Sequence, residues 1–207
     1  AETVVAGGIV GEKVAEFLQG YEINLSTAHV NDCMGKMKQR IDDLVRGKNG
    51  RENVYEVRGE MQQALMDGCF VFRNEQGLTE CVGKLQNTLE RARRVGLRSN
   101  GTGVAPELSA ALRIEGQLKL SLMIAKAALE RKESRGSHNR EDFTARDDKN
   151  WLNRTLAYWR EGADMPELQY EDASPVFELP PGERGYGGGQ IIPADQAMVE
   201  ARTIKKG

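Results

Sequence analysis

The sequence contains few of the residues on which disulfide and metal chemistry depend. Among 207 residues there are three cysteines, Cys33, Cys69 and Cys81, widely spaced and without a C-x-x-C pair. An odd number of isolated cysteines predicts reduced thiols and a reducing compartment rather than a disulfide framework or a zinc or iron–sulfur site. Because His29 and His138 are the only histidines, a mononuclear metal centre would have to use mostly carboxylates. We therefore expect no metal site.

The sequence also lacks an excess of charge and a long apolar run. Its 29 Lys and Arg nearly balance 31 Asp and Glu, giving a formal net charge of −2. Nothing in this balance favours nucleic acid or an anionic membrane surface as a partner. No apolar run is long enough to span a bilayer, and the first residues do not resemble a signal peptide. We expect a soluble chain without a visible targeting signal.

From Ser26 to Glu133, apolar residues recur almost throughout at the three- and four-residue spacing of amphipathic helices. Asn53 is expected to cap one helix, with Glu56 in capping-box position, and Pro106 suits the first turn of another. Such helices bury their apolar stripes against one another, so the sequence predicts a mainly α fold, a spectrin-repeat-like bundle of three to four helices. The faces are lined by Val30, Met34, Met37, Ile41 and Leu44; Val57, Met61, Ala64, Leu65 and Gly68; Leu78, Val82, Leu85 and Leu89; and Leu108, Leu112, Glu115, Leu118, Leu122, Ala125 and Leu129.

After Gly136 the composition changes. Aromatic and apolar residues concentrate between Trp151 and Trp159, and "ELQYED" is typical of a short strand. The stretch "ELPPGERGYGGGQIIP" is expected to run over a surface without a core of its own. A small irregular α+β tail is therefore predicted to follow the bundle.

Residues 1–19 contain the one pattern that could bind a nucleotide. The apolar run Val4-Val5-Ala6 precedes Gly7, Gly8 and Gly11. However, the spacing is G-G-x-x-G rather than G-x-G-x-x-G, and no acidic residue closes a second strand about 20 positions on. A single helix whose small residues allow close packing is the simpler interpretation.

The segment "ERKESRGSHNREDFTARDDKNW", from Glu130 to Trp151, concentrates the side chains that enzymes use. A serine hydrolase is disfavoured, because Ser134 lacks the G-x-S-x-G elbow and His138 is only four residues away. A metal site is disfavoured by the shortage of histidine. Between Arg131 and Lys149 there are six basic and five acidic residues. This near balance favours a salt-bridged structural network over a catalytic site.

We interpret this segment as an anchored connector between the long helix and the next one. Glu133 and Arg135 are expected to close the long helix, and Gly136 to supply the left-handed turn that ends it. The Asp147-Asp148 pair is expected to start the following helix. The residues assigned to the connector are Glu133, Ser134, Arg135, Gly136, His138, Arg140, Asp147 and Asp148.

Three motifs together suggest a family. The run "RKESRGSHNREDFTARDDKNWLNRTLAYW" contains ESRG-x-H-x-R-x-D followed by RDD-x-N-W and Thr-Leu. "MQQALMDGCFVFRNEQGL" contains a helix with a Gly-Cys-x-x-x-Arg end, and "LPPGERGYGG" contains a Pro-Pro and Tyr-Gly pattern. In these features the chain closely resembles the C-terminal helical domain of the flavoprotein subunit of fumarate reductase and succinate dehydrogenase. The resemblance covers nearly the whole chain.

This resemblance implies how the chain is organised. Residues 1–20 would be the terminal helix of the flavin-binding domain, and 21–135 the helical bundle. Residues 136–207 would form a connector loop, a short helix, a short strand and an extended surface tail. The catalytic residues and the histidine that commonly holds FAD are expected upstream of Ala1, with Glu2 adjacent to the last FAD contact. We therefore expect no catalytic residue in this chain and no tight binding of FAD or a dicarboxylate by it alone.

The resemblance also implies partners. The bundle would pack beside the FAD-binding domain of the same subunit and support assembly with an iron–sulfur subunit and, through it, a membrane anchor. Arg135, His138 and Arg140 would point toward the FAD-binding domain or the iron–sulfur subunit. The parent enzyme would interconvert fumarate and succinate by hydride transfer with FAD, as a peripheral complex on the inner face of the cytoplasmic membrane. Two alternatives stay open: a stand-alone helical interaction protein, and the corresponding domain of an L-aspartate oxidase-like flavoprotein.

Overall fold

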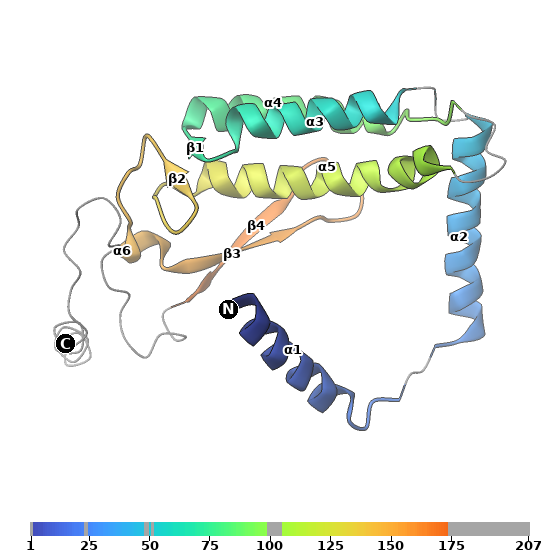
Figure 1. Ribbon diagram of the computed structural model, residues 1–207, viewed down its shortest axis with the longest axis horizontal. Helices are drawn as coiled ribbons and strands as arrows, with labels where there is room; N and C mark the ends of the chain where they lie inside the picture. Colours follow the sequence, from blue (N-terminus) through green and yellow to red (C-terminus); the bar gives the residue numbers. More distant parts are fainter. Residues whose placement is uncertain (1, 23–24, 48–49, 51, 99–104, 174–207) are drawn as a thin grey trace. The chain divides into compact units, whose positions relative to one another are not determined.

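A computed structural model describes residues 2–22, 25–47, 50, 52–98 and 105–173 (Figure 1). The chain divides into two compact units, Ala1–Asp43 and Leu44–Gly207. Helices dominate the described residues, and the short strands all lie in the second unit. The predicted fold class, a mainly α bundle with a small α+β addition, is confirmed. The predicted surface tail lies outside the described residues from position 174 onward.

The first unit contains helix α1 (Glu2–Leu18) and most of helix α2 (Thr27–Arg46). Helix α1 runs without a break through Gly7, Gly8 and Gly11, which confirms the single-helix interpretation and rules out a strand–turn–helix phosphate loop there. Its large apolar side chains are exposed, with exposed fractions between 50 % at Val14 and 77 % at Val4. The set comprises Val4, Val5, Ile9, Val10, Val14, Phe17 and Leu18.

Helix α2 corrects one expectation about packing. The spacing of its apolar stripe predicted the helix, but the stripe was also expected to be buried against neighbouring helices. Instead Val30, Met34 and Met37 are exposed, and only Leu44 at the far end is buried. Periodicity identifies the apolar side of a helix but not what covers it, so the pattern could not reveal this outcome.

The second unit is a three-helix bundle of α3 (Val54–Gly68), α4 (Glu75–Ala92) and α5 (Pro106–Glu130). Helix α4 runs opposite to α3 and α5, and each helix contacts the other two (Figure 1). The predicted stripes supply much of the core, but Leu65, Leu108, Leu112 and Leu129 are only partly buried, and the buried Val54 and Ile114 were not among the predicted residues. The fully buried side chains of the core include Val54, Val57, Leu78, Leu85, Ile114, Leu118 and Leu122.

Local signals fix the beginnings of these helices. Asn53 caps α3 as predicted, because its side chain accepts the Tyr55 N–H, while its amide donates to Glu56. Asn74 caps α4 in the same way through the Gly77 N–H. Helix α5 begins at Pro106, as the sequence predicted.

Glycine allows α3 and α4 to approach closely where the chain turns between them. A Cβ atom at Gly68 would lie 2.8 Å from the Cβ of Cys81 and closer still to the carbonyl oxygen of Gly77. No larger residue fits without moving the backbone. The contact draws the end of α3 onto the start of α4, at the end of the bundle where the connector lies.

Two small sheets complete the second unit. Strands β1 (Phe72–Arg73) and β2 (Asn139–Arg140) pair in parallel. The four-residue helix α6 (Asp148–Trp151) precedes an antiparallel hairpin of β3 (Asn153–Tyr158) and β4 (Glu167–Asp172), with β3 along α5 (Figure 1). The strand predicted at "ELQYED" is confirmed, whereas β3 was not predicted.

Candidate functional site

The connector (residues 131–147) leaves α5 earlier than expected. Helix α5 ends at Glu130, and Arg131 is its extended C-terminal cap. Glu133 and Arg135 therefore lie beyond the helix and do not close it. Gly136 does adopt the predicted left-handed conformation, with φ +58°, but it forms the tight turn between Arg135 and His138 rather than ending the helix.

Arg140 explains why α5 stops where it does. Its side chain is fully buried, and Nη1 donates to the carbonyl oxygens of Ala128 and Leu129, both at 3.0 Å, and of Arg131 at 3.3 Å. Nε and Nη2 donate to the two carboxylate oxygens of Asp142, each at 2.7 Å. A cation at the C-terminal end of a helix also interacts favourably with the helix dipole. The expectation that Arg140 points out toward another domain is therefore wrong.

Asp142 connects Arg140 to the start of α4. Besides binding Arg140, it accepts the Glu75 backbone N–H at 2.8 Å. The Arg140 guanidinium and the Glu75 N–H together lower the Asp142 pKa to about 2. Next to it, Glu141 accepts the side-chain amide of Asn74, and its own N–H donates to the carbonyl oxygen of Arg73. The connector thus satisfies the C-terminal end of α5 and the N-terminal end of α4 together.

Glu133 is the centre of a second cluster. Its fully buried carboxylate accepts hydrogen bonds from Arg131 at 2.7 Å, from Arg135 at 2.8 Å and from the Asp147 N–H at 2.8 Å. Burial opposes its ionisation, but the bond from Arg135 and those from Asp147 and Arg131 hold the Glu133 pKa below its usual range. Arg135 also binds Asp148.

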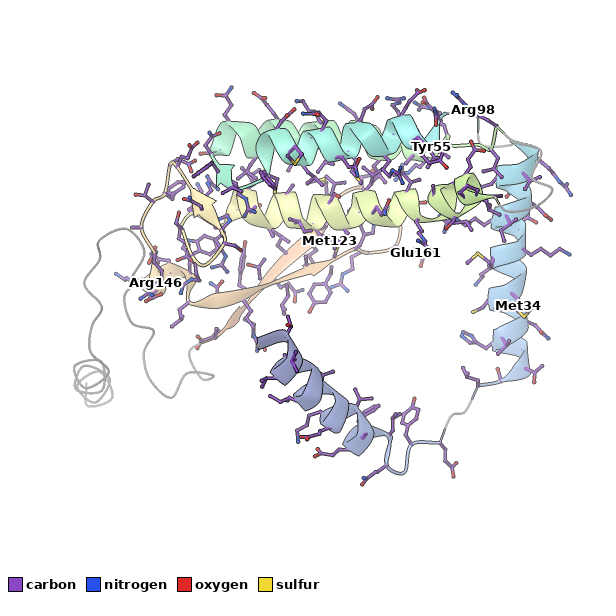
Figure 2. The ribbon with its side chains drawn as sticks, in the orientation of Figure 1. Met34, Tyr55, Arg98, Met123, Arg146 and Glu161 are labelled. Atoms are coloured by element: carbon purple, nitrogen blue, oxygen red, sulfur yellow. The ribbon has the colours of Figure 1, made fainter. Side chains whose placement is uncertain are left out.

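These contacts confirm the predicted salt-bridged network. Arg146 also pairs with Asp148, at 2.9 Å, and Figure 2 labels Arg146 at the connector end of the second unit. Asp147 caps α6 by accepting the Asn150 N–H, which confirms that the aspartate pair starts this helix. Among the connector side chains that the structure describes, no buried polar atom lacks a hydrogen-bond partner.

The geometry does not support a nucleophilic Ser134. Its hydroxyl donates to the Phe143 carbonyl at 2.8 Å and accepts the Arg140 N–H at 2.8 Å, so both functions hold the loop backbone together. Ser134 is 7 % exposed. The His138 ring is engaged elsewhere. Ser134 is therefore a buried residue whose hydroxyl stabilises the loop through two backbone hydrogen bonds.

His138 links the connector to the α3–α4 turn. Arg73 Nη1 donates to His138 Nδ1 at 2.8 Å, and because arginine stays protonated, Nδ1 must be the acceptor. The proton then sits on Nε2, which faces the Arg131 carbonyl at 3.3 Å. Burial, and the charges of Arg73, Arg140 and Arg131, lower the His138 pKa below its ordinary value. His138 is thus held neutral in a cage of arginines.

We expect acid to loosen this link. A histidine whose pKa is lowered by folding contributes stability that is present above its unfolded pKa of about 6.5 and is lost as pH falls through the folded value. Between those two pH values the free energy of unfolding should fall by up to about 1.4 kcal/mol per pH unit more in the wild type than in His138→Gln. Denaturant unfolding from pH 7 to pH 5 measures this difference. Parallel curves for the two proteins would contradict the assignment of neutral His138.

Sequence reasoning missed two partners of this site. Arg131 donates to the carbonyl oxygens of Trp151 and Asn153 as well as to Glu133, and so fixes the start of β3. Arg73 lies 65 positions from His138. A local pattern gives no signal for such a pairing, although Arg73 stands directly before the capping residue Asn74. The side chain of Glu2 lies outside what the structure describes, so its expected place near FAD stays a prediction.

Metal ligands, reactive cysteines and membrane-spanning helices are the other features that could carry a function. Among the described residues, no group of three or more His, Cys, Asp or Glu side chains could hold a metal ion. The three cysteines are free thiols, and burial raises the pKa of Cys81 to about 11. None of the described helices has the length and apolarity needed to cross a bilayer.

A hollow beside the connector has a volume of about 430 Å³ and is lined by Asp148, Lys149, Asn153 and Tyr170 among others. Its lining combines one lysine with acidic and amide side chains. Recognition of a dicarboxylate needs several convergent cationic donors. This hollow does not offer them.

Fold and site together define the chain as a helical bundle whose end is closed by a buried ion-pair network. The family model described as "Fumarate reductase flavoprotein C-term" matches residues 58–186. The fumarate reductase flavoprotein subunit of Helicobacter pylori is 37 % identical over 196 residues, which cover 93 % of this chain and 27 % of that protein. The Escherichia coli subunit is 34 % identical over 99 % of this chain and 34 % of its own length.

Solved structures agree. The FrdA chain of an E. coli quinol fumarate reductase variant matches with a TM-score of 0.72 and 32 % identity, over 81 % of this chain and 28 % of that one. The chain therefore belongs to the family of C-terminal domains of fumarate reductase flavoprotein subunits. It spans only about a quarter to a third of the length of these curated relatives.

Proposed function

We propose that this domain supports the assembly of a fumarate reductase or succinate dehydrogenase flavoprotein and takes no direct part in its chemistry. The observation that carries the proposal is that the charged side chains of the connector bond to other parts of the same domain. Arg140 bonds to Asp142 and to the end of α5, Asp142 also bonds to the start of α4, and Glu133 bonds to Arg135. None of the three lines the hollow beside the connector. An arginine with its donors committed in this way is poorly placed to donate a proton to a substrate.

The proposal also covers the reaction of the complete protein to which this domain would belong. The relatives are named as flavoprotein subunits of fumarate reductase, so the complete protein would bind FAD in another domain and interconvert fumarate and succinate there. Electrons would pass through an iron–sulfur subunit toward quinone, and the complex would lie peripherally at the inner face of the cytoplasmic membrane. The quinol fumarate reductase named among the solved structures supports this setting.

Helix α1 is proposed to pack on the FAD-binding domain. Its exposed apolar residues, including Ile9 and Val10, form more apolar surface than a single helix normally leaves in water. This assignment agrees with residues 1–20 as the terminal helix of that domain. The bundle of α3, α4 and α5 would follow after α2, and the connector would hold the bundle in register against the catalytic part.

The test is to replace Arg135, the more exposed of the two arginines that bond to Glu133, in the complete flavoprotein subunit. Arg135→Ala removes charge-assisted bonds to Glu133 and Asp148 and should cost about 1–3 kcal/mol of stability. We expect less flavoprotein associated with the iron–sulfur subunit. The kcat of each properly assembled complex should be nearly unchanged. Subunit co-purification, flavin content and kcat measure these effects.

Arg154→Ala is the matched control. Arg154 pairs with Glu171 on the exposed β3–β4 hairpin, and such surface pairs contribute little. Normal assembly and flavin content in Arg135→Ala, His138→Ala or Arg140→Ala, with kcat reduced by about 10²-fold, would instead identify a catalytic acid in the connector. That outcome would end the assembly proposal.

A further inference from the structure

Helix α2 carries the second histidine and the exposed cysteine one turn apart. His29 and Cys33 are both exposed, and Nε2 of the ring lies 3.7 Å from Sγ of the thiol. The backbone N–H of His29 donates to Ser26 Oγ, which caps the helix at this point. Both residues belong to the first unit, so their geometry depends on α2 alone.

The distance between the two donor atoms suits a tetrahedral metal ion. With a metal–nitrogen bond of about 2.05 Å, a metal–sulfur bond of about 2.3 Å and a tetrahedral angle, the nitrogen and sulfur would lie about 3.6 Å apart. The observed separation is 3.7 Å. The separation of the two donor atoms is therefore already compatible with both binding one ion.

The surroundings leave the pair available for a ligand. The nearest acidic residue in sequence, Asp32, is paired with Lys36 at 2.7 Å, so the charge of this lysine is already compensated. On binding an ion, Cys33 would release its proton to solvent and coordinate as a thiolate, whose negative charge would offset the cation near the positive end of the helix dipole. Met34 and Met37 on the same helix are exposed as well, and Figure 2 labels Met34 there.

We propose that His29 and Cys33 form a two-donor site for a thiophilic divalent cation of the Zn²⁺ or Cd²⁺ class. Imidazole nitrogen and thiolate sulfur are donors that such ions prefer over carboxylate-rich sites. The described residues add no third His, Cys, Asp or Glu to the pair, so water or an outside ligand completes the coordination. This site is separate from the connector and independent of the proposed function.

Cd²⁺ titration of the 207-residue chain tests the proposal, because a thiolate–Cd²⁺ bond gives an ultraviolet charge-transfer band. We expect a saturable band from a single equivalent of Cd²⁺. Cys33→Ser should abolish the band, and His29→Ala should weaken binding by about tenfold or more, since even outer-shell metal partners are worth 10–100-fold. Met34→Leu, which removes a neighbouring sulfur, should leave both the band and the affinity unchanged.

Circular dichroism of each variant checks that the fold is intact, which the exposure of both side chains leads us to expect. Equal affinity in the wild type and His29→Ala would show simple binding to a thiol and overturn the two-donor site. A band that persists in Cys33→Ser would place the metal at Cys69 or Cys81 and also overturn it. Absence of any saturable band in the wild type has the same consequence.

Discussion

Replacing Arg140 with methionine is expected to lower the free energy of unfolding by about 3–5 kcal/mol, the usual cost of removing one partner from a buried ion pair. Methionine keeps an apolar side chain of similar length, but it cannot donate, and it loses the guanidinium that lies over the Phe143 ring. Three carbonyl oxygens at the end of α5 would lose their donor, and Asp142 would lose its bidentate partner. Denaturant titration of the wild type and the variant measures the difference.

Two further variants separate the charge pair from the helix-end contacts. Asp142→Asn alone weakens the pair but keeps the Arg140 bonds to α5. The double variant Arg140→Met/Asp142→Asn completes a thermodynamic cycle that isolates the coupling of the two side chains. Arg154→Met on the exposed hairpin should cost less than about 1 kcal/mol. A loss in Arg140→Met no greater than in Arg154→Met would show that the buried cluster is not a stabilising element.

The ion pair between Arg140 and Asp142 should be lost only at strongly acidic pH. The Asp142 pKa, lowered to about 2 by Arg140, lies below the unfolded value of about 3.9, so the stabilisation is present above the unfolded value and is lost as pH falls toward 2. The loosening expected from His138 begins at a higher pH. The two links of the connector should thus fail in separate pH ranges.

The parts of this structure that the sequence predicted depend on neighbours along the chain. Asn53 with Glu56 marks a helix start within four residues, and "ELQYED" marks a strand within six. The pairing of Arg140 with Asp142 spans two positions and that of Arg135 with Glu133 spans two, so a balanced run of charges was enough to anticipate the network.

The parts that escaped prediction depend on which elements meet. Arg73 reaches His138 across 65 positions, and Asp142 reaches the Glu75 N–H across 67. The end of α5 was misplaced for the same reason. Residues 131–133 have good helix propensity, but a guanidinium from β2 binds the carbonyl oxygens of Ala128, Leu129 and Arg131 and ends the helix at Glu130. Tertiary contacts here override local preference.

Replacing Glu133 with alanine should cost about as much as the loss of Arg140, roughly 3–5 kcal/mol, but it should act on a different part of the domain. Glu133 holds Arg131, and Arg131 in turn holds Trp151 and Asn153 at the start of β3. Without the carboxylate, the positive charges of Arg131 and Arg135 would lose the negative charge that they share. The Asp147 N–H would also lose its acceptor. The hairpin should therefore loosen before the bundle does.

Amide hydrogen exchange distinguishes this local effect from a general one. In Glu133→Ala, protection in β3 and β4 should fall by a larger factor than in α3 and α4, because opening of the hairpin becomes a separate, cheaper event. Glu133→Gln keeps the shape and one acceptor oxygen, so its loss should be smaller and still concentrated in the hairpin. Equal losses of protection across α3, α4 and the hairpin would mean that Glu133 stabilises the domain as a whole. Then the Arg131 link to β3 would not be the route by which the connector anchors the hairpin.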